Sequence, residues 1–111
     1  MKRGEIYWVE FPAPVGRRPA VLVSRNESYS VRSRCIVVPL TRTIRGIPTE
    51  VRIGPGDGLP KAGVANADDI VTVPNTLLRN RITALTDTRI AELDQALLFS
   101  LGLDSRGAGK T

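Results

Sequence analysis

The segment from Gly16 to Ser24 constrains the fold most, because it places two adjacent arginines directly before an uninterrupted apolar run. Pro19 disfavours a helical backbone at Arg18 and favours an extended one. The run 20–23 is apolar and rich in β-branched side chains, which is typical of a strand buried on both faces. We therefore expect a rigid strand with a guanidinium group at its N-terminal end, a favourable arrangement for binding phosphate. The alternative for an isolated Arg-Arg pair is an ordinary solvated loop.

Most other apolar runs are also short, and the predicted strands do not alternate with predicted helices along the chain. The connection 25–34 is polar and is expected to be exposed. Such a series of short strands favours a small curled antiparallel sheet or barrel over a parallel sheet. Strands are predicted at 4–11, 20–24, 35–38 (ending at Pro39), 48–53, 63–73 (one bent strand or two short ones, broken by an acidic pair) and 81–85, with a short turn or a single helical turn at 74–78.

One longer helix is predicted near the C-terminus, capped by Thr86 or Asp87, ending at about Leu101 and stopped by Gly102. Phe99 falls on the opposite side of this helix from its apolar stripe. There it is either an exposed side chain or a contact with a second subunit. We expect one domain over 1–103 and a disordered tail over 104–111. The side chains predicted to face the barrel are Ile90, Leu93, Leu97 and Leu101.

Cysteine and histidine content excludes several classes of site. The single cysteine, Cys35, allows no internal disulfide and no Cys-rich zinc site. The absence of histidine removes the commonest general base and the commonest transition-metal ligand. No apolar run approaches the length of a membrane span, and no signal peptide is evident, so the cytoplasm is the expected location.

The net charge of +5 is concentrated in the first half of the chain. Residues 1–53 contain ten Lys or Arg against four acids, whereas 54–111 contain six against seven. Thirteen of the sixteen basic residues are arginine, which favours bidentate recognition of phosphate. A polyanionic partner is therefore expected, with nucleic acid the obvious choice.

Several polar side chains at predicted strand ends suit RNA cleavage without a metal. That reaction needs a base for the 2′-hydroxyl, positive charge beside the developing phosphorane, and a proton for the leaving oxygen. Arg18 suits the electrostatic role, and Thr41 can donate a hydrogen bond to a phosphate oxygen, although a strand-end threonine often only satisfies the backbone. Asp68 and Asp69 point to opposite faces of a strand, which disfavours a metal pair and leaves one of them as a base or as a partner of an arginine. Arg42 and Arg45 are expected to contact the RNA backbone.

The order of these motifs resembles the MazF/PemK toxin family over residues 2–103. The motifs are Arg3-Gly-Glu-Ile-Tyr-Trp-Val, Arg18-Pro-Ala-Val-Leu-Val-Ser, Val37-Val-Pro-Leu-Thr41, Pro48-Thr-Glu-Val, and an Ile-Thr-Ala-Leu strand leading into a Leu-rich helix. The resemblance implies a mainly β, SH3-like barrel with a C-terminal helix. It also implies a homodimeric, metal-independent endoribonuclease that needs no cofactor and cuts single-stranded RNA, leaving 2′,3′-cyclic phosphate and 5′-hydroxyl ends. A MazE-like antitoxin is the implied partner, with operator DNA bound only through it.

The resemblance also assigns roles to individual residues. Arg18 matches the active-site arginine of the family, Thr41 its active-site Thr or Ser, and Asp68 a catalytic aspartate of some members. Asn66 stands where some members carry a second arginine, and the first loop, 12–16, is shorter than usual. The predicted catalytic residues are therefore Arg18, Thr41 and Asp68, and the predicted RNA-binding residues are Arg17, Arg42, Arg45 and Asn66.

Two alternatives share this fold. One is a catalytically inactive member that only binds nucleic acid, which would bind RNA without cutting it. The other is a gyrase-inhibiting toxin of the CcdB kind. Such toxins use a tryptophan near the C-terminus, whereas the only tryptophan here is Trp8.

Overall fold

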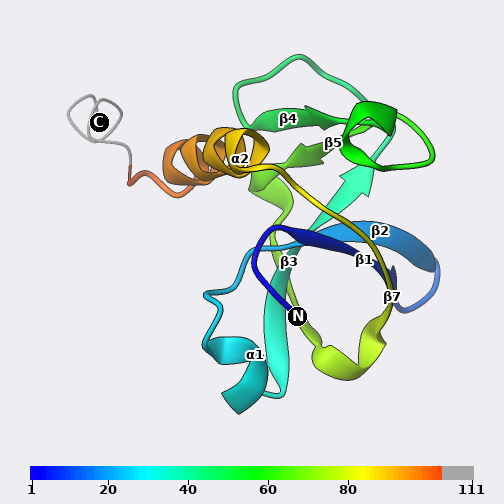
Figure 1. The fold of residues 1–111 in the computed structure, drawn as a ribbon. Helices are drawn as coiled ribbons and strands as arrows, with labels where there is room; N and C mark the ends of the chain where they lie inside the picture. The colour runs from blue at the N-terminus through cyan, green and yellow to red at the C-terminus, as the bar shows by residue number, and fades with distance from the viewer. Residues whose placement is uncertain (104–111) are drawn as a thin grey trace.

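The computed structural model describes residues 1–103, and the tail predicted for 104–111 lies outside them. Within the described residues, a curled antiparallel sheet of seven strands carries a C-terminal helix, α2, against its β4–β5 end (Figure 1). This confirms the predicted fold class. The elements are β1 (Glu5–Glu10), β2 (Arg17–Leu22), α1 (Ser28–Val31), β3 (Arg34–Thr41), β4 (Glu50–Ile53), η1 (Pro55–Asp57), β5 (Gly63–Asn66), η2 (Ala67–Asp69), β6 (Val71–Pro74), η3 (Asn75–Leu77), β7 (Leu78–Ala84) and α2 (Asp87–Ser100).

Strand β3 is the centre of the sheet, whose order is β4-β5-β3-β2-β1-β7 with β6 also paired to β3. One edge of β3 pairs with β2. The other edge changes partner along its length, with β6 opposite residues 34–37 and β5 opposite residues 40–41. Pro39 lies at this change of partner, where neither ladder needs its missing N–H. The prediction that Pro39 ends the strand was therefore wrong, and β3 continues to Thr41.

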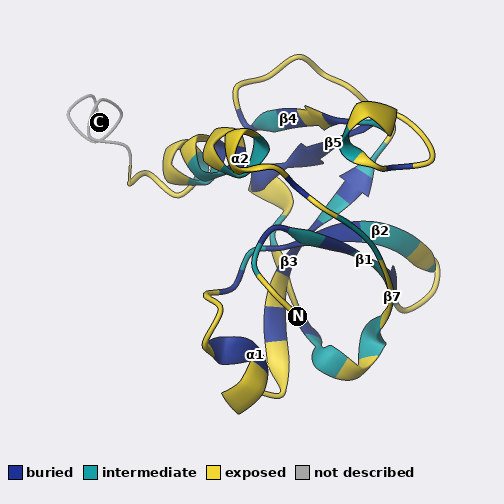
Figure 2. Cartoon of the chain, in the orientation of Figure 1, coloured by how far each residue is buried: buried dark blue, intermediate teal, exposed yellow. Residues whose placement is uncertain are grey.

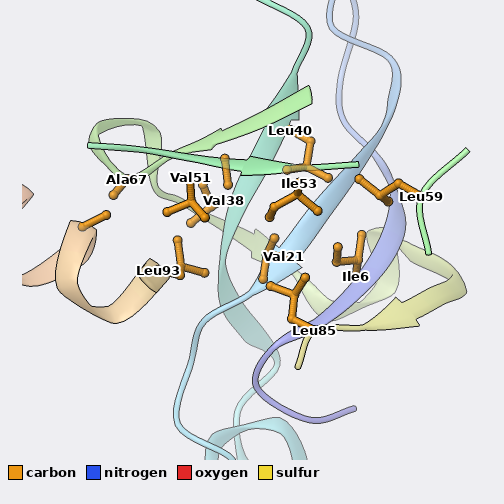
Figure 3. Close-up of a cluster of buried hydrophobic side chains, with 12 residues drawn as sticks. Ile6, Val21, Val38, Leu40, Val51, Ile53, Leu59, Ala67, Leu85 and Leu93 are labelled. Atoms are coloured by element: carbon orange, nitrogen blue, oxygen red, sulfur yellow. The ribbon is translucent and has the colours of Figure 1, made fainter. Parts of the chain in front are cut away.

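The sheet buries side chains on both faces (Figure 2). One core cluster includes Ile6 and Val21, which are opposite each other in the β1–β2 register, and it extends to Leu93 of α2 (Figure 3). A second cluster contains Val9 and Leu22 together with Tyr29 of α1. This double burial accounts for the uninterrupted apolar runs of β2 and β3.

Helix α2 begins as predicted, with the Thr86 side chain accepting a hydrogen bond from the Arg89 N–H at 3.3 Å. Leu93 is 1% exposed, and Ile90 and Leu97 pack against the same core. The helix ends at Ser100, close to the predicted end, and Gly102 follows with a φ of +71°. Leu101 does not face the barrel, because the helix has ended there and its side chain is 53% exposed.

Other parts of the sequence prediction also differ from the structure. Strand β2 starts at Arg17, so both arginines belong to the strand and pair with Glu10 and Val9 of β1. The segment 25–34 is not a fully exposed connection, because it forms α1 and buries Tyr29 in the second cluster. Strand β7 starts at Leu78, three residues before the predicted start. The acidic break over 67–69 and the helical turn over 75–77 are confirmed as η2 and η3.

The helices in residues 1–103 are all too short or too polar to cross a membrane.

Candidate active site

A cleft of about 590 Å³ lies over the ends of β2 and β3. Its floor includes Leu40 and Leu59, which also belong to the main core cluster. Both side chains lie toward the upper right of that cluster in Figure 3. The cleft is therefore built onto the rigid core and not onto loops alone. It is lined by Trp8, Arg17, Arg18, Pro19, Leu40, Thr41, Arg42, Thr43, Leu59, Pro60, Lys61, Ala62 and Gly63.

Arg18 and Thr41 are brought together by the register of β2 and β3. Ala20 pairs with Pro39 in this antiparallel ladder. Arg18 lies two residues before Ala20 and Thr41 two residues after Pro39, so both extend beyond this pair at the same end of the antiparallel ladder. Both residues line the cleft. Two catalytic predictions that are 23 positions apart in the chain thus meet at adjacent strand ends.

The Thr41 hydroxyl is oriented by its own backbone turn. Its Oγ1 accepts a hydrogen bond from the Thr43 N–H at 3.3 Å. A hydroxyl has one hydrogen and two lone pairs, so accepting this bond leaves its hydrogen available. Thr41 is thus able to donate a hydrogen bond to a ligand in the cleft.

The cleft lining carries positive charge without compensating carboxylates. Its charged residues are Arg17, Arg18, Arg42 and Lys61, and none of its lining residues is Asp, Glu or His. Within residues 1–103, the arginines that form ion pairs with carboxylates are Arg3, Arg81 and Arg89, and none of these three lines the cleft. The cleft cations therefore remain available to an anionic ligand such as a phosphodiester.

Arg45 does not line the cleft, and it lies on a loop whose backbone is hydrogen-bonded to Glu50. The Glu50 carboxylate accepts hydrogen bonds from the backbone N–H groups of Arg45, Gly46 and Ile47, at 2.8–3.4 Å. Desolvation raises the pKa of Glu50, but these backbone donors outweigh it, so the pKa lies below its usual value. Glu50 orders the basic loop and was not singled out from the sequence.

Asp68 and Asn66 lie away from this cleft. The Asn66 Oδ1 accepts hydrogen bonds from the buried Thr49 hydroxyl at 2.8 Å and from the Asp68 N–H at 3.0 Å. Asn66 is 6% exposed and caps η2. The Asp68 carboxylate accepts a hydrogen bond from the Ser100 hydroxyl at 2.6 Å. The structure thus does not bring Asp68 or Asn66 to Arg18 and Thr41, and their predicted roles in the reaction stay predictions.

The cleft residues that the sequence did not predict include Trp8, Lys61 and Gly63. Trp8 and Gly63 were interpreted only as parts of strands, and Lys61 was given no role. The alternation of side chains along β1 could have indicated a place for Trp8 at the rim of the core. Trp8 shares a face of the strand with Ile6 and lies nearer to the strand end. Nothing local indicates Lys61, whose place depends on how the segment after η1 folds back over β3.

Among residues 1–103, no three Asp, Glu, Cys or His side chains form a group that could hold a metal ion.

Comparison with known proteins identifies the family to which the chain belongs. Residues 2–101 match the model of the family described as PemK-like, MazF-like toxin of type II toxin-antitoxin system. The chain belongs to the MazF/PemK toxin family. It is 40% identical over 96 residues to the probable endoribonuclease MazF5 of Mycobacterium tuberculosis, covering 86% of this chain and 87% of that protein.

Solved structures of the MazF/PemK family have the same fold. A mycobacterial endoribonuclease in complex with its cognate antitoxin matches with a TM-score of 0.81 and 32% identity, covering 93% of this chain and 96% of that one. The Mycobacterium tuberculosis toxin MazF-mt6 matches with a TM-score of 0.82 and 26% identity, covering 90% and 98%. The resemblance recognised from the five sequence motifs is therefore confirmed.

Proposed function

We propose that this MazF/PemK chain is the endoribonuclease toxin of a toxin–antitoxin pair and cuts single-stranded RNA in the cleft at the ends of β2 and β3. The observation that carries the proposal is the juxtaposition of Arg18 and Thr41 in a cationic cleft lined by no carboxylate. Family membership and the endoribonuclease names of the relatives support it.

The proposed reaction is an internal transesterification. The 2′-hydroxyl of one ribose loses its proton to a base as its oxygen attacks the adjacent phosphorus. The bond from phosphorus to the 5′-oxygen breaks, and that oxygen takes up a proton, so one proton is lost and one is gained. The products are a 2′,3′-cyclic phosphate and a 5′-hydroxyl. Arg18 stabilises the extra negative charge on the phosphorane, and Thr41 donates a hydrogen bond to one of its oxygens. Arg17 and Arg42 contact the RNA beside the scissile phosphate, and Arg45 acts from the adjacent loop.

We further propose that the reaction needs no metal ion. The support is the donor set of the cleft, because divalent cations such as Mg²⁺ are held by carboxylate oxygens and none lines it. The lining cations supply the positive charge that a metal would otherwise provide.

The proposed partners are a MazE-like antitoxin and a second copy of the chain, with operator DNA contacted only through the antitoxin. A mycobacterial structural relative was solved with its cognate antitoxin, which supports the first. An apolar surface at the end of α2 supports the second, because Leu98, Leu101 and Leu103 are 36–66% exposed and line one groove with Ile36 of β3. Cytoplasmic RNA is the proposed substrate pool.

The decisive experiment compares wild type with Arg18→Ala on mixed-sequence single-stranded RNA in EDTA, with mapping of the ends. Cleavage by wild type alone, leaving 2′,3′-cyclic phosphate, supports the proposal. Full activity of Arg18→Ala at an unchanged melting temperature overturns the role of Arg18. RNA binding without cleavage by wild type would favour the non-catalytic alternative, and inhibition of gyrase without RNA binding would favour the CcdB-like one.

A further inference from the structure

Trp8 and Arg17 form a stacked pair on the wall of the cleft. The Arg17 Cζ lies 4.9 Å from the centroid of the Trp8 ring, within the range of a cation–π contact. Both side chains line the cleft that contains Arg18 and Thr41.

The β1–β2 register explains this pairing. Trp8 is directly opposite Pro19, and Arg17 is opposite Glu10. Arg17 is therefore the diagonal neighbour of Trp8 on the same sheet face, a position from which long side chains reach aromatic rings. The pair is fixed by two strands of the sheet, which holds it in place more rigidly than a loop would.

This face of β1 is the face of the main core. Ile6, two residues before Trp8, is completely buried, whereas Trp8 is only half-buried and lies at the rim. Leu40 and Leu59 belong both to this core cluster and to the lining of the cleft. The indole ring therefore adds an aromatic surface to a cleft whose charged residues are all cations.

Arg17 is not engaged by a carboxylate. Glu10 is its partner in the strand register, yet no ion pair joins them, and Arg17 makes none with any other of residues 1–103. Its guanidinium group instead lies over the indole ring, and Arg17 is exposed and lines the cleft. Planar guanidinium and indole groups are the two surfaces on which unpaired nucleobases stack in RNA-binding proteins.

We propose that the Trp8–Arg17 pair is a stacking platform for one unpaired nucleobase of the RNA, next to the phosphate held by Arg18 and Thr41. The inference rests on the proposed ribonuclease function and extends it to the conformation of the substrate, a single strand with one base turned out of the stack. Because every base has a π-face, the platform contributes affinity and positioning more than sequence choice. Trp8 and Arg17 are positioning residues here, since neither acts on the reacting atoms.

The first test uses the fact that Trp8 is the only tryptophan in the chain. Its fluorescence reports on the platform without a label. Cleavage sites are first mapped on mixed-sequence RNA, and an oligonucleotide of the mapped sequence is then made non-cleavable with a 2′-O-methyl group at that site. We expect quenching of Trp8 emission that saturates together with fluorescence anisotropy of the labelled oligonucleotide. Full binding by anisotropy with unchanged Trp8 emission would overturn the proposal.

The second test is kinetic. Trp8→Leu should raise KM roughly 5- to 100-fold with little change in kcat, and Trp8→Phe should restore most of the loss. An abasic substitution next to the cleavage site should weaken wild type by a similar factor and leave Trp8→Leu unaffected. Wild-type KM in a folded Trp8→Leu variant would overturn the platform while leaving the ribonuclease assignment intact. Absence of both RNA binding and cleavage in wild type would overturn the proposed function and the platform with it.

Discussion

The backbone of Thr41 lies against Gly63 so closely that a Cβ atom on Gly63 would come within 2.7 Å of the Thr41 carbonyl oxygen. Thr41 is the last residue of β3, and Gly63 is the first residue of β5, whose next residue, Val64, pairs with Thr41. The absence of a side chain at Gly63 therefore allows β5 to approach β3 closely. This approach positions residues 59–63, which line the cleft, beside the proposed catalytic Thr41.

We expect Gly63→Ala to impair cleavage. The added methyl group meets backbone rather than a flexible side chain, so Thr41 or β5 must shift by several tenths of an ångström. Displacement of a positioned group on this scale lowers kcat by roughly 10-fold or more. The matched control is Gly56→Ala, where a Cβ would meet nothing within 4 Å. Equal activity of the two variants on the mapped RNA would contradict this positioning role.

Thr41→Val should lower kcat/KM by roughly 10- to 100-fold, because it replaces the hydroxyl with a methyl group of similar size. A hydrogen bond to a charged phosphate oxygen contributes about 1.5–3 kcal/mol. Thr41→Ser keeps the hydroxyl and should retain most of the activity. Wild-type turnover by the valine variant would show that the Thr41 hydroxyl serves only the backbone N–H of Thr43.

The sequence predicted the centre of the cleft because that part depends on local signals. The apolar runs after Arg18 and before Thr41 indicate two buried strands, and antiparallel neighbours bring their opposite ends together. The error at Pro39 arose because a proline was interpreted as a strand end, whereas the sheet changes partner at that residue. That change of partner depends on β5 and β6, which lie far along the chain.

The rest of the cleft depends on contacts that no local pattern encodes. Lys61 follows a turn whose Asp57 is held by Arg89 of α2, 32 residues away. The place of Asp68 depends in the same way on Ser100, at the last turn of α2. Strand alternation reveals which face a residue occupies, but not which distant segment covers it.

Asp68→Asn should leave cleavage within about threefold of wild type. The Asp68 side chain is bonded to Ser100 and is not among the cleft residues, and an asparagine oxygen still accepts that hydrogen bond. Single-turnover cleavage of the mapped RNA measures this directly. Loss of more than about 100-fold in kcat with an unchanged melting temperature would restore Asp68 to the catalytic set.

Asp57→Asn should make stability less dependent on acidic pH. Burial raises the pKa of Asp57, but the Gly54 N–H and the Arg89 guanidinium outweigh burial, so the pKa lies below its ordinary value of 3.8. A carboxylate with a lowered pKa in the folded state contributes stability above pH 3.8, and this contribution is lost as pH falls through the folded value.

The expected decrease in melting temperature for Asp57→Asn at pH 7 is roughly 5 °C, equivalent to about 1 kcal/mol in a domain of this size. The difference from wild type should close as the pH falls below 3.8. Asp69→Asn, at an exposed residue of η2, is the control and should melt like wild type at pH 7. A difference that stays constant down to pH 3 would show that the charge of Asp57 is not what stabilises the turn.

Leu101→Asp should convert a dimer to monomers, whereas Phe99→Asp should not. The two side chains lie in different grooves on opposite sides of the C-terminal end of α2. Phe99 is 49% exposed, but its groove is also lined by Arg52, Arg89 and Glu92, and the centres of dimer interfaces are depleted of charge.

The groove of Leu101 is mainly apolar and continues onto Ile36 of β3, and its two charged residues, Arg3 and Asp94, neutralise each other at 2.7 Å. Burying an aspartate in such a surface without a partner costs several kcal/mol, enough to abolish micromolar association. Sedimentation of both variants beside wild type decides between the faces. Dissociation by Phe99→Asp alone would move the interface to the β4 side of the helix, and a wild-type monomer would exclude both faces.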